Sequence, residues 1–138
     1  MQRRTFIIGT VGLTIAPAIA MAETGWSEPM AIRFASGSAE LGASQQGELE
    51  AVVKAFQARP NPHNGDWVRV TGYMDQAERS QFLRELPLQR ANAVAEAFEN
   101  LEGARGRTRP RRGTSLLVQK PGPLAENRVV LLSWPVSS

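Results

Sequence analysis

Apolar and polar positions along the chain follow a two-residue repeat in several short segments. Residues 30–34 alternate between the two kinds of side chain, which predicts a half-buried strand. A second strand is predicted from Trp67 to Thr71, and Gly72 ends it. Further short strands are expected at about Thr114 to Gln119 and Arg128 to Trp134, on either side of a loop rich in proline and glycine.

Between these strands, apolar residues recur every three or four positions and predict two helices. Ser44 is expected to cap the first helix, which runs to about Arg59 and has as its apolar face Leu49, Val52, Val53 and Phe56. The second helix begins near Pro87, because proline suits a first turn, and Gly103 is its expected stop. Its apolar stripe consists of Leu88, Ala91, Val94, Ala95, Phe98 and Leu101.

This order of elements predicts an α/β fold of the α+β sandwich kind, with two helices on one face of a sheet of about four strands. The first strand, first helix and second strand are expected to form a βαβ unit with a right-handed crossover. Residues 60–66 are dense in turn formers, and the polar segment 75–85 is expected to hold at most a helical turn. The predicted order is therefore βαβαβ(β).

The first 22 residues have the three-part plan of a secretory signal peptide. Arg3 and Arg4 are followed by an apolar stretch and a small-residue end at 20–22, and the paired arginines resemble the twin-arginine export motif. We therefore expect a periplasmic protein, exported by the Sec or twin-arginine route, with no transmembrane span after cleavage. The expected segments are a signal peptide at 1–22, a polar tether at 23–29, one domain at 30–134 and a tail at 135–138.

Composition narrows the kinds of chemistry open to the chain. Its 138 residues suffice for one domain, and its net charge of +3 falls to +1 without Arg3 and Arg4. The sequence has no cysteine, and its only histidine is His63, in a turn. No metal site, cofactor or catalytic triad is therefore expected, and no phosphate-binding glycine motif is present. The chain is predicted not to be an enzyme.

Five arginines follow the second helix with no acidic residue among them: Arg105, Arg107, Arg109, Arg111 and Arg112. Guanidinium groups pair with oxyanions, so this run is a candidate patch for an anionic partner. A solvated basic loop is the alternative interpretation. Because no aromatic residues are interleaved, nucleic-acid binding is not expected.

The strongest candidate site lies where the second strand ends. Asp75 follows Gly72 closely, at the carboxyl edge where ligands bind in open α/β sheets. Arg90 lies one turn inside the next helix, and folding that helix back on the sheet is expected to bring its guanidinium near the Asp75 carboxylate. A purely structural ion pair is the competing interpretation of these two residues.

Four segments in this order resemble the OmpA-like peptidoglycan-binding domain, over about residues 30–134. They are Ile32-Arg33-Phe34 with Gly37-Ser38-Ala39-Glu40-Leu41, Gly72-Tyr73-Met74-Asp75, Leu86-Pro87-Leu88-Gln89-Arg90-Ala91-Asn92-Ala93-Val94, and Asn127-Arg128-Val129-Val130. The resemblance implies that Asp75 and Arg90 hold the amine and the carboxylate of diaminopimelate in the peptide stem. It also places Gly72 and Arg128 in the ligand-binding set.

The chain departs from the family pattern at Met74, Leu83, Pro87 and Val129. Each departure removes a polar group that could position ligand or loop. Our leading hypothesis is a non-catalytic peptidoglycan-binding protein of the cell envelope. The alternative is a periplasmic scaffold domain of the same fold, with weakened or lost peptidoglycan binding, that holds another envelope protein through the arginine run or the face around Trp67.

Overall fold

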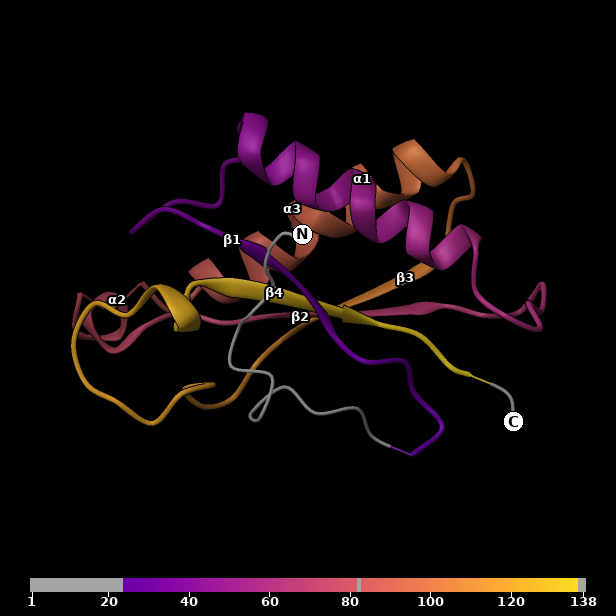
Figure 1. The fold of residues 1–138 in the computed structure, drawn as a ribbon. Helices are drawn as coiled ribbons and strands as arrows, with labels where there is room; N and C mark the ends of the chain where they lie inside the picture. The colour runs from indigo at the N-terminus through magenta and orange to yellow at the C-terminus, as the bar shows by residue number, and fades with distance from the viewer. Residues whose placement is uncertain (1–23, 82, 137–138) are drawn as a thin grey trace, which may run out of the picture.

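The computed structural model describes residues 24–81 and 83–136 (Figure 1). Its strands are β1 (Met30–Arg33), β2 (Val68–Gly72), β3 (Thr108–Arg112) and β4 (Val129–Ser133). Its helices are α1 (Ala43–Gln57), α2 (Gln76–Ser80) and α3 (Leu86–Glu102), with a short 3-10 helix η1 at Ala125–Asn127. The predicted signal peptide lies outside the described residues. No described helix has the length and apolar character needed to cross a bilayer.

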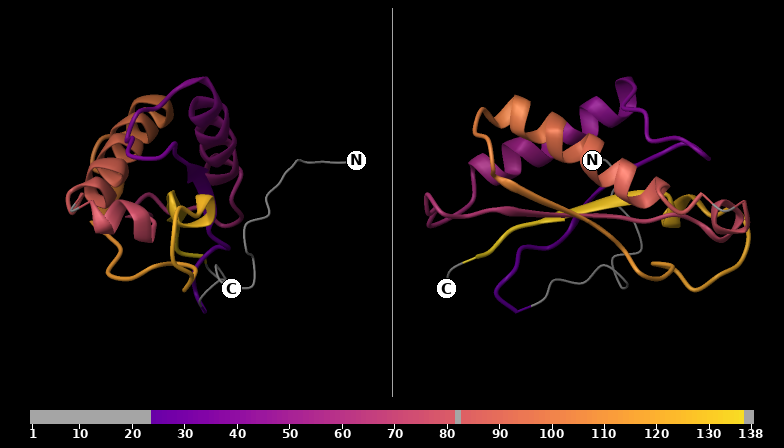
Figure 2. Two further views of the ribbon diagram at one scale, coloured as in Figure 1. Left: turned by 90° about the vertical axis from the view of Figure 1, so that its left-hand side faces the viewer. Right: turned by 180° about the vertical axis from the view of Figure 1, so that it is seen from behind.

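The four strands form one mixed sheet in the order β1-β4-β2-β3. The last strand in the chain, β4, runs antiparallel to both β1 and β2 and lies between them. The strands of the expected first βαβ unit are therefore parallel but not adjacent. The adjacent parallel pair is β2 with β3, which α3 connects. Both long helices cover the same face of the sheet (Figures 1 and 2), as the sequence predicted.

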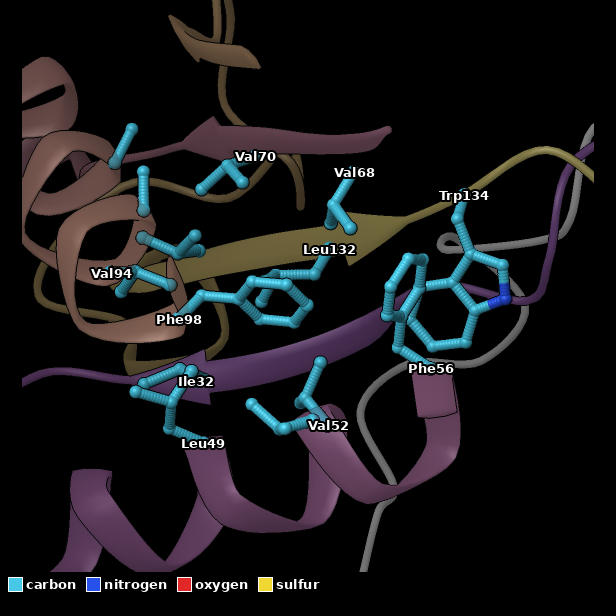
Figure 3. Close-up of a cluster of buried hydrophobic side chains, with 14 of the residues drawn as sticks. Ile32, Leu49, Val52, Phe56, Val68, Val70, Val94, Phe98, Leu132 and Trp134 are labelled. Atoms are coloured by element: carbon cyan, nitrogen blue, oxygen red, sulfur yellow. The ribbon is translucent and has the colours of Figure 1, made fainter. Parts of the chain in front are cut away.

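The hydrophobic core fills the space between the helices and the sheet (Figure 3). All four apolar residues predicted for α1 are buried, and they pack with Ile32 of β1 and with Val68 and Val70 of β2. On α3, Ala91, Val94, Ala95 and Phe98 are buried as expected, while Leu101 is exposed. The periodicity thus located the middle of the α3 core face correctly. At its ends the prediction was less exact, since Leu88 of the first turn is only half-buried and Leu101 of the last turn is exposed.

Two local predictions were wrong. Residues 114–119 form no strand, and the third strand is instead β3, within the arginine run. As an edge strand β3 buries only Thr108, so it lacks the apolar alternation that identifies a half-buried strand. The first helix is capped by Gly42 and not by Ser44. The Gln45 side chain accepts a hydrogen bond from the Gly42 N–H (3.0 Å), which the sequence pattern did not indicate.

Residues of the predicted tether, 23–29, pair with the segment that directly follows β4. The Ser27 N–H donates to the Trp134 carbonyl (2.8 Å), and the Val136 N–H donates to the Gly25 carbonyl (2.9 Å). The Ser27 hydroxyl in turn accepts a hydrogen bond from the Trp134 N–H (3.0 Å). The two ends of the described chain therefore lie side by side, at the end of the sheet opposite α2 (Figure 1).

Candidate functional site

The candidate site lies at the carboxyl end of β2, where several loops meet. The loop between β1 and α1, the short helix α2, the first turns of α3 and the loop before β4 all contribute residues. These segments are far apart in the sequence. They converge because α3 folds back over the end of β2, and because β4 enters the sheet next to β2.

Arg90 is fully buried and every N–H group of its guanidinium has an acceptor. Nε donates to the Ser38 carbonyl (2.8 Å), one terminal nitrogen to the Tyr73 carbonyl (2.9 Å), and the other to the Ala35 carbonyl (3.1 Å). The two remaining N–H groups form a fork on the carboxylate of Glu78, at 3.0 and 2.6 Å. A guanidinium forms five such bonds at most, so the side chain is saturated.

Glu78, on α2, is the residue that the sequence reasoning missed. Its side chain is 1% exposed, and its carboxylate accepts four hydrogen bonds. Two come from Arg90, one from the Gly37 N–H (2.7 Å) and one from the Asp75 N–H (2.9 Å). A sequence signal was available, because an acid three residues after an N-cap aspartate forms a capping box.

Asp75 is also fully buried, and its carboxylate accepts hydrogen bonds from three residues. Its Oδ1 accepts from the Glu78 N–H (2.8 Å), so the side chain caps α2. Its Oδ2 accepts from Nη1 of Arg128 (2.9 Å) and from the Leu124 N–H (3.2 Å). Arg128, 18% exposed, also donates to the Phe34 carbonyl (3.2 Å). Asp75 therefore joins the end of β2 to the loop before β4.

The structure brings the two predicted site residues, Asp75 and Arg90, into one cluster, but their charged groups are not bonded to each other. Arg90 pairs with Glu78, and Asp75 pairs with Arg128. Glu78 links the pairs, since it bonds both to the guanidinium of Arg90 and to the backbone of Asp75. The arrangement is a chain of hydrogen bonds in which the two carboxylates, Glu78 and Asp75, lie in the middle and the two guanidinium groups, Arg90 and Arg128, lie at the ends.

Gly72 lies beside this cluster and permits a close approach of backbones. A side chain on Gly72 would overlap the carbonyl group of Pro87 in the first turn of α3. The glycine therefore sets how closely α3, and Arg90 with it, packs against the end of β2. Among the departures from the family pattern, Val129 is buried in β4, Pro87 is buried in the first turn of α3, and Met74 lines a surface pocket.

The five arginines of the predicted patch are divided by the strand β3. Arg105 lies before the strand, and Arg107 donates to the carbonyls of Asn64 (3.1 Å) and Asp66 (2.8 Å), which ties it to the loop before β2. Arg109, Arg111 and Arg112 are exposed on β3. By the two-residue repeat of a strand, Arg109 and Arg111 lie on one face of the sheet and Arg112 on the other. Arg111 donates to the Thr71 hydroxyl (3.1 Å).

A pocket of about 420 Å³ opens at the carboxyl ends of β2 and β3, the two parallel strands. Three arginines line it, Arg79, Arg84 and Arg112, together with Met74 and the segment 113–116. Arg112 also donates to the Arg84 carbonyl (3.1 Å). The lining has no acidic residue, so its chemistry favours an anion.

Three carboxylates outside the cluster have displaced pKa values. Burial raises the pKa of Glu48, which outweighs its hydrogen bond from the Arg33 N–H. Burial also acts to raise the pKa of Glu99, but hydrogen bonds from the hydroxyl and N–H of Thr108 prevail and lower it. Burial likewise acts to raise the pKa of Asp66, but its hydrogen bonds from the Arg59 side chain and the His63 N–H prevail and lower it. These groups anchor loops and strand ends.

Among the described residues, no group of three or more histidine, cysteine, aspartate or glutamate side chains is placed to hold a metal ion. The backbone of His63 belongs to the turn before β2, where its N–H donates to Asp66 (3.1 Å). Trp67 is half-buried, and its ring meets that of Trp26 edge-on at 5.3 Å. The face around Trp67 is thus partly covered by the segment before β1.

Comparisons with known proteins agree on one family. The model of the OmpA family matches residues 33–112. Among solved structures, the cell wall anchor of the T6SS from Pseudomonas aeruginosa is 25% identical with a TM-score of 0.62, and the match covers 79% of this chain and 81% of that one. No curated protein matches the sequence significantly.

Two other solved structures share the fold at lower identity. The OmpA-like domain of FopA1 from Francisella tularensis subsp. tularensis SCHU S4 is 21% identical, with a TM-score of 0.59 over 76% of this chain and 70% of that one. The peptidoglycan-associated lipoprotein from Burkholderia pseudomallei is 19% identical, with a TM-score of 0.58 over 76% and 89%. The match to each of them covers most of the present domain.

Proposed function

Because this chain belongs to the OmpA family, we propose that it binds peptidoglycan without catalysing a reaction, in the periplasm. Two of the similar structures carry names that point the same way, one a peptidoglycan-associated lipoprotein and the other a cell wall anchor. The signal-like segment at 1–22 supports export to that compartment. The finer proposal is that the ligand is the zwitterionic end of a diaminopimelate-type stem peptide.

One observation supports this choice above the others: a carboxylate is held at Arg90. The guanidinium fork and two backbone N–H groups converge on a single carboxylate, that of Glu78, and the Asp75 carboxylate lies in the same cluster. A donor cradle beside an acid is the chemistry that recognises an amino acid carrying both charges. In our proposal Arg90 takes the ligand carboxylate and Asp75 its ammonium, while Arg128 and Gly72 shape the surroundings.

A co-sedimentation assay with purified sacculi tests the proposal. The protein is expected to sediment with sacculi, and the isosteric change Asp75→Asn and the charge-conserving change Arg90→Lys are each expected to reduce the bound fraction. Lys54→Gln, an exposed charge on α1, is the control and should bind as the wild type does. Near-ultraviolet circular dichroism of each variant establishes that it is folded. Equal binding by wild type, Asp75→Asn and Arg90→Lys would rule out this site.

The finer claim about the stem peptide has its own test. A soluble stem peptide with diaminopimelate should compete with sacculi, whereas the same peptide with lysine lacks the second carboxylate and should compete less well. Since a lost charge-assisted hydrogen bond costs about 1.5–3 kcal/mol, the ratio of inhibition constants should be at least about 10-fold. Equal competition would contradict recognition of the diaminopimelate carboxylate.

A second candidate function rests on the basic edge of the sheet. Exposed arginines on β3 and the arginine-lined pocket beside it would suit an acidic envelope protein held by a scaffold domain of this fold. In that case capture of the partner would weaken as salt rises, because exposed charges are screened. Sacculi would not retain the protein, and Arg109→Gln with Arg112→Gln would abolish partner capture.

A further inference from the structure

We infer that the ligand site of this domain is occupied by the chain's own charges, with Glu78 in the place of a ligand carboxylate and Arg128 in the place of a ligand ammonium. This inference rests on the proposed function for the identity of the ligand. It concerns the same site and adds a residue, Glu78, that controls access to it.

The first support is the completeness of the Glu78 contacts. A carboxylate offers about four acceptor positions, and all of those of Glu78 are used, by Gly37 N–H, Asp75 N–H and two N–H groups of Arg90. Burial of a carboxylate costs several kcal/mol when it is not paired in this way. The four donors thus form a binding site for a carboxylate.

The second support is that the cradle does not depend on Glu78 for its shape. Arg90 is held independently by the carbonyls of Ala35, Ser38 and Tyr73. The Gly37 N–H comes from the loop before α1, so three of the four donors belong to segments remote from α2, and the fourth, the Asp75 N–H, lies at the N-cap of α2. Removal of the Glu78 side chain would therefore leave a preorganised cradle with no anion in it.

The third support is that Asp75, the acid that would hold a ligand ammonium, already has a cationic partner within the chain. An ammonium group arriving at Asp75 would find its Oδ2 taken by Arg128 at 2.9 Å and by the Leu124 N–H at 3.2 Å. Both charges of a zwitterionic ligand are thus represented in the ligand-free protein. A stem peptide has to displace Glu78, and the cost of that displacement lowers its apparent affinity.

Chemical rescue tests the cradle without reference to peptidoglycan. Glu78→Ala removes the carboxylate, and sodium acetate supplies one in solution. Acetate is expected to raise the Tm of Glu78→Ala saturably, by about 4–8 °C, while the wild type shifts by less than about 1 °C. Sodium chloride at equal ionic strength is the salt control. If Glu78→Ala is unfolded in buffer, acetate should refold it, as read by near-ultraviolet circular dichroism.

Glu48→Ala is the matched control variant. Glu48 also accepts from a backbone N–H (3.0 Å) and lies 3.6 Å from an arginine, Arg33, but both side chains are partly exposed and form no closed cradle. Its Tm should not respond to acetate. Absence of an acetate response in Glu78→Ala, or an equal response in Glu48→Ala, overturns the inference.

Co-sedimentation with sacculi then separates this inference from the function on which it rests. If both hold, Glu78→Ala is expected to bind sacculi at least about 10-fold more tightly than the wild type. Acetate rescue with no retention of either protein would uphold the occupied cradle and reject peptidoglycan as the ligand. Retention of both proteins with equal affinity would uphold peptidoglycan binding and reject the control by Glu78.

Discussion

The domain uses arginine in two opposite ways at neighbouring places. Arg90, at the end of β2, is buried and donates all its N–H groups to carbonyls and to Glu78. Arg109, Arg111 and Arg112, on β3, are exposed at the edge of the sheet. Both regions carry guanidinium groups. Because Arg90 is buried, its guanidinium helps to hold the fold together, whereas the exposed guanidinium groups on β3 belong to the surface.

The largest effect is expected for Arg90→Ala. Loss of the guanidinium leaves the buried Glu78 carboxylate without its partner, and breaking a buried ion pair costs about 3–5 kcal/mol. Urea denaturation followed by tryptophan fluorescence measures the free energy of unfolding. A cost below about 1 kcal/mol would mean that Arg90 is not buried as described.

A smaller effect is expected for Asp75→Ala. The change removes the cap of α2 and the partner of Arg128, which is partly exposed and regains water. Together these losses should cost about 1–3 kcal/mol in the free energy of unfolding. Asp75→Asn keeps a cap acceptor and should cost less than the alanine change. An Asn variant as unstable as the Ala variant would show that the cap contributes little.

A modest pH dependence of the free energy of unfolding is expected from Glu99, which anchors β3 to α3. Glu99 accepts from the Thr108 N–H (3.0 Å) and hydroxyl (2.6 Å), and its folded-state pKa lies below the ordinary value of 4.5. The unfolded chain therefore takes up this proton at higher pH than the folded one, so stability is lost as pH falls through and below 4.5. Urea denaturation from pH 7 to 3 should show a smaller loss in Glu99→Gln than in the wild type.

The smallest effect is expected at the exposed arginines. Arg109→Gln and Arg112→Gln remove exposed charges that bond to backbone carbonyls at the surface, so each should change the free energy of unfolding by less than about 0.5 kcal/mol. The same urea assay measures it. A loss above 1 kcal/mol in either variant would erase the contrast with Arg90.

The sequence predicted the helical parts of the fold better than the edge of the sheet. The stripe of α1 was visible because its buried residues recur at helical spacing, and Gly103 ends α3 with a φ of 94°, as a helix stop requires. The strand β3 was not visible, because a strand paired on one side buries little and this one contains a proline. Its position is set by pairing with β2, a long-range contact that no local pattern encodes.

The candidate site was predictable in its location and not in its pairing. The position of Asp75 after a strand and of Arg90 in the next helix indicated one end of the sheet, and both residues lie there. Which carboxylate faces the guanidinium depends on the rotation of α2, a five-residue helix with too short a pattern to interpret. The spacing of Asp75 and Glu78 is that of a capping box, but a capping box does not reveal that the Glu78 side chain also reaches Arg90.

The position of β3 at the end of the sheet has a consequence for the protein at high concentration. Within the part of the chain that the structure describes, its outer side pairs with no further strand, and such an edge is the surface onto which a second chain can add and start a fibre. Pro110 removes one donor from the strand, and the arginines around it make like-charged chains repel each other. Neutralising these arginines should therefore shorten the lag time of aggregation, even though the fold itself hardly needs them.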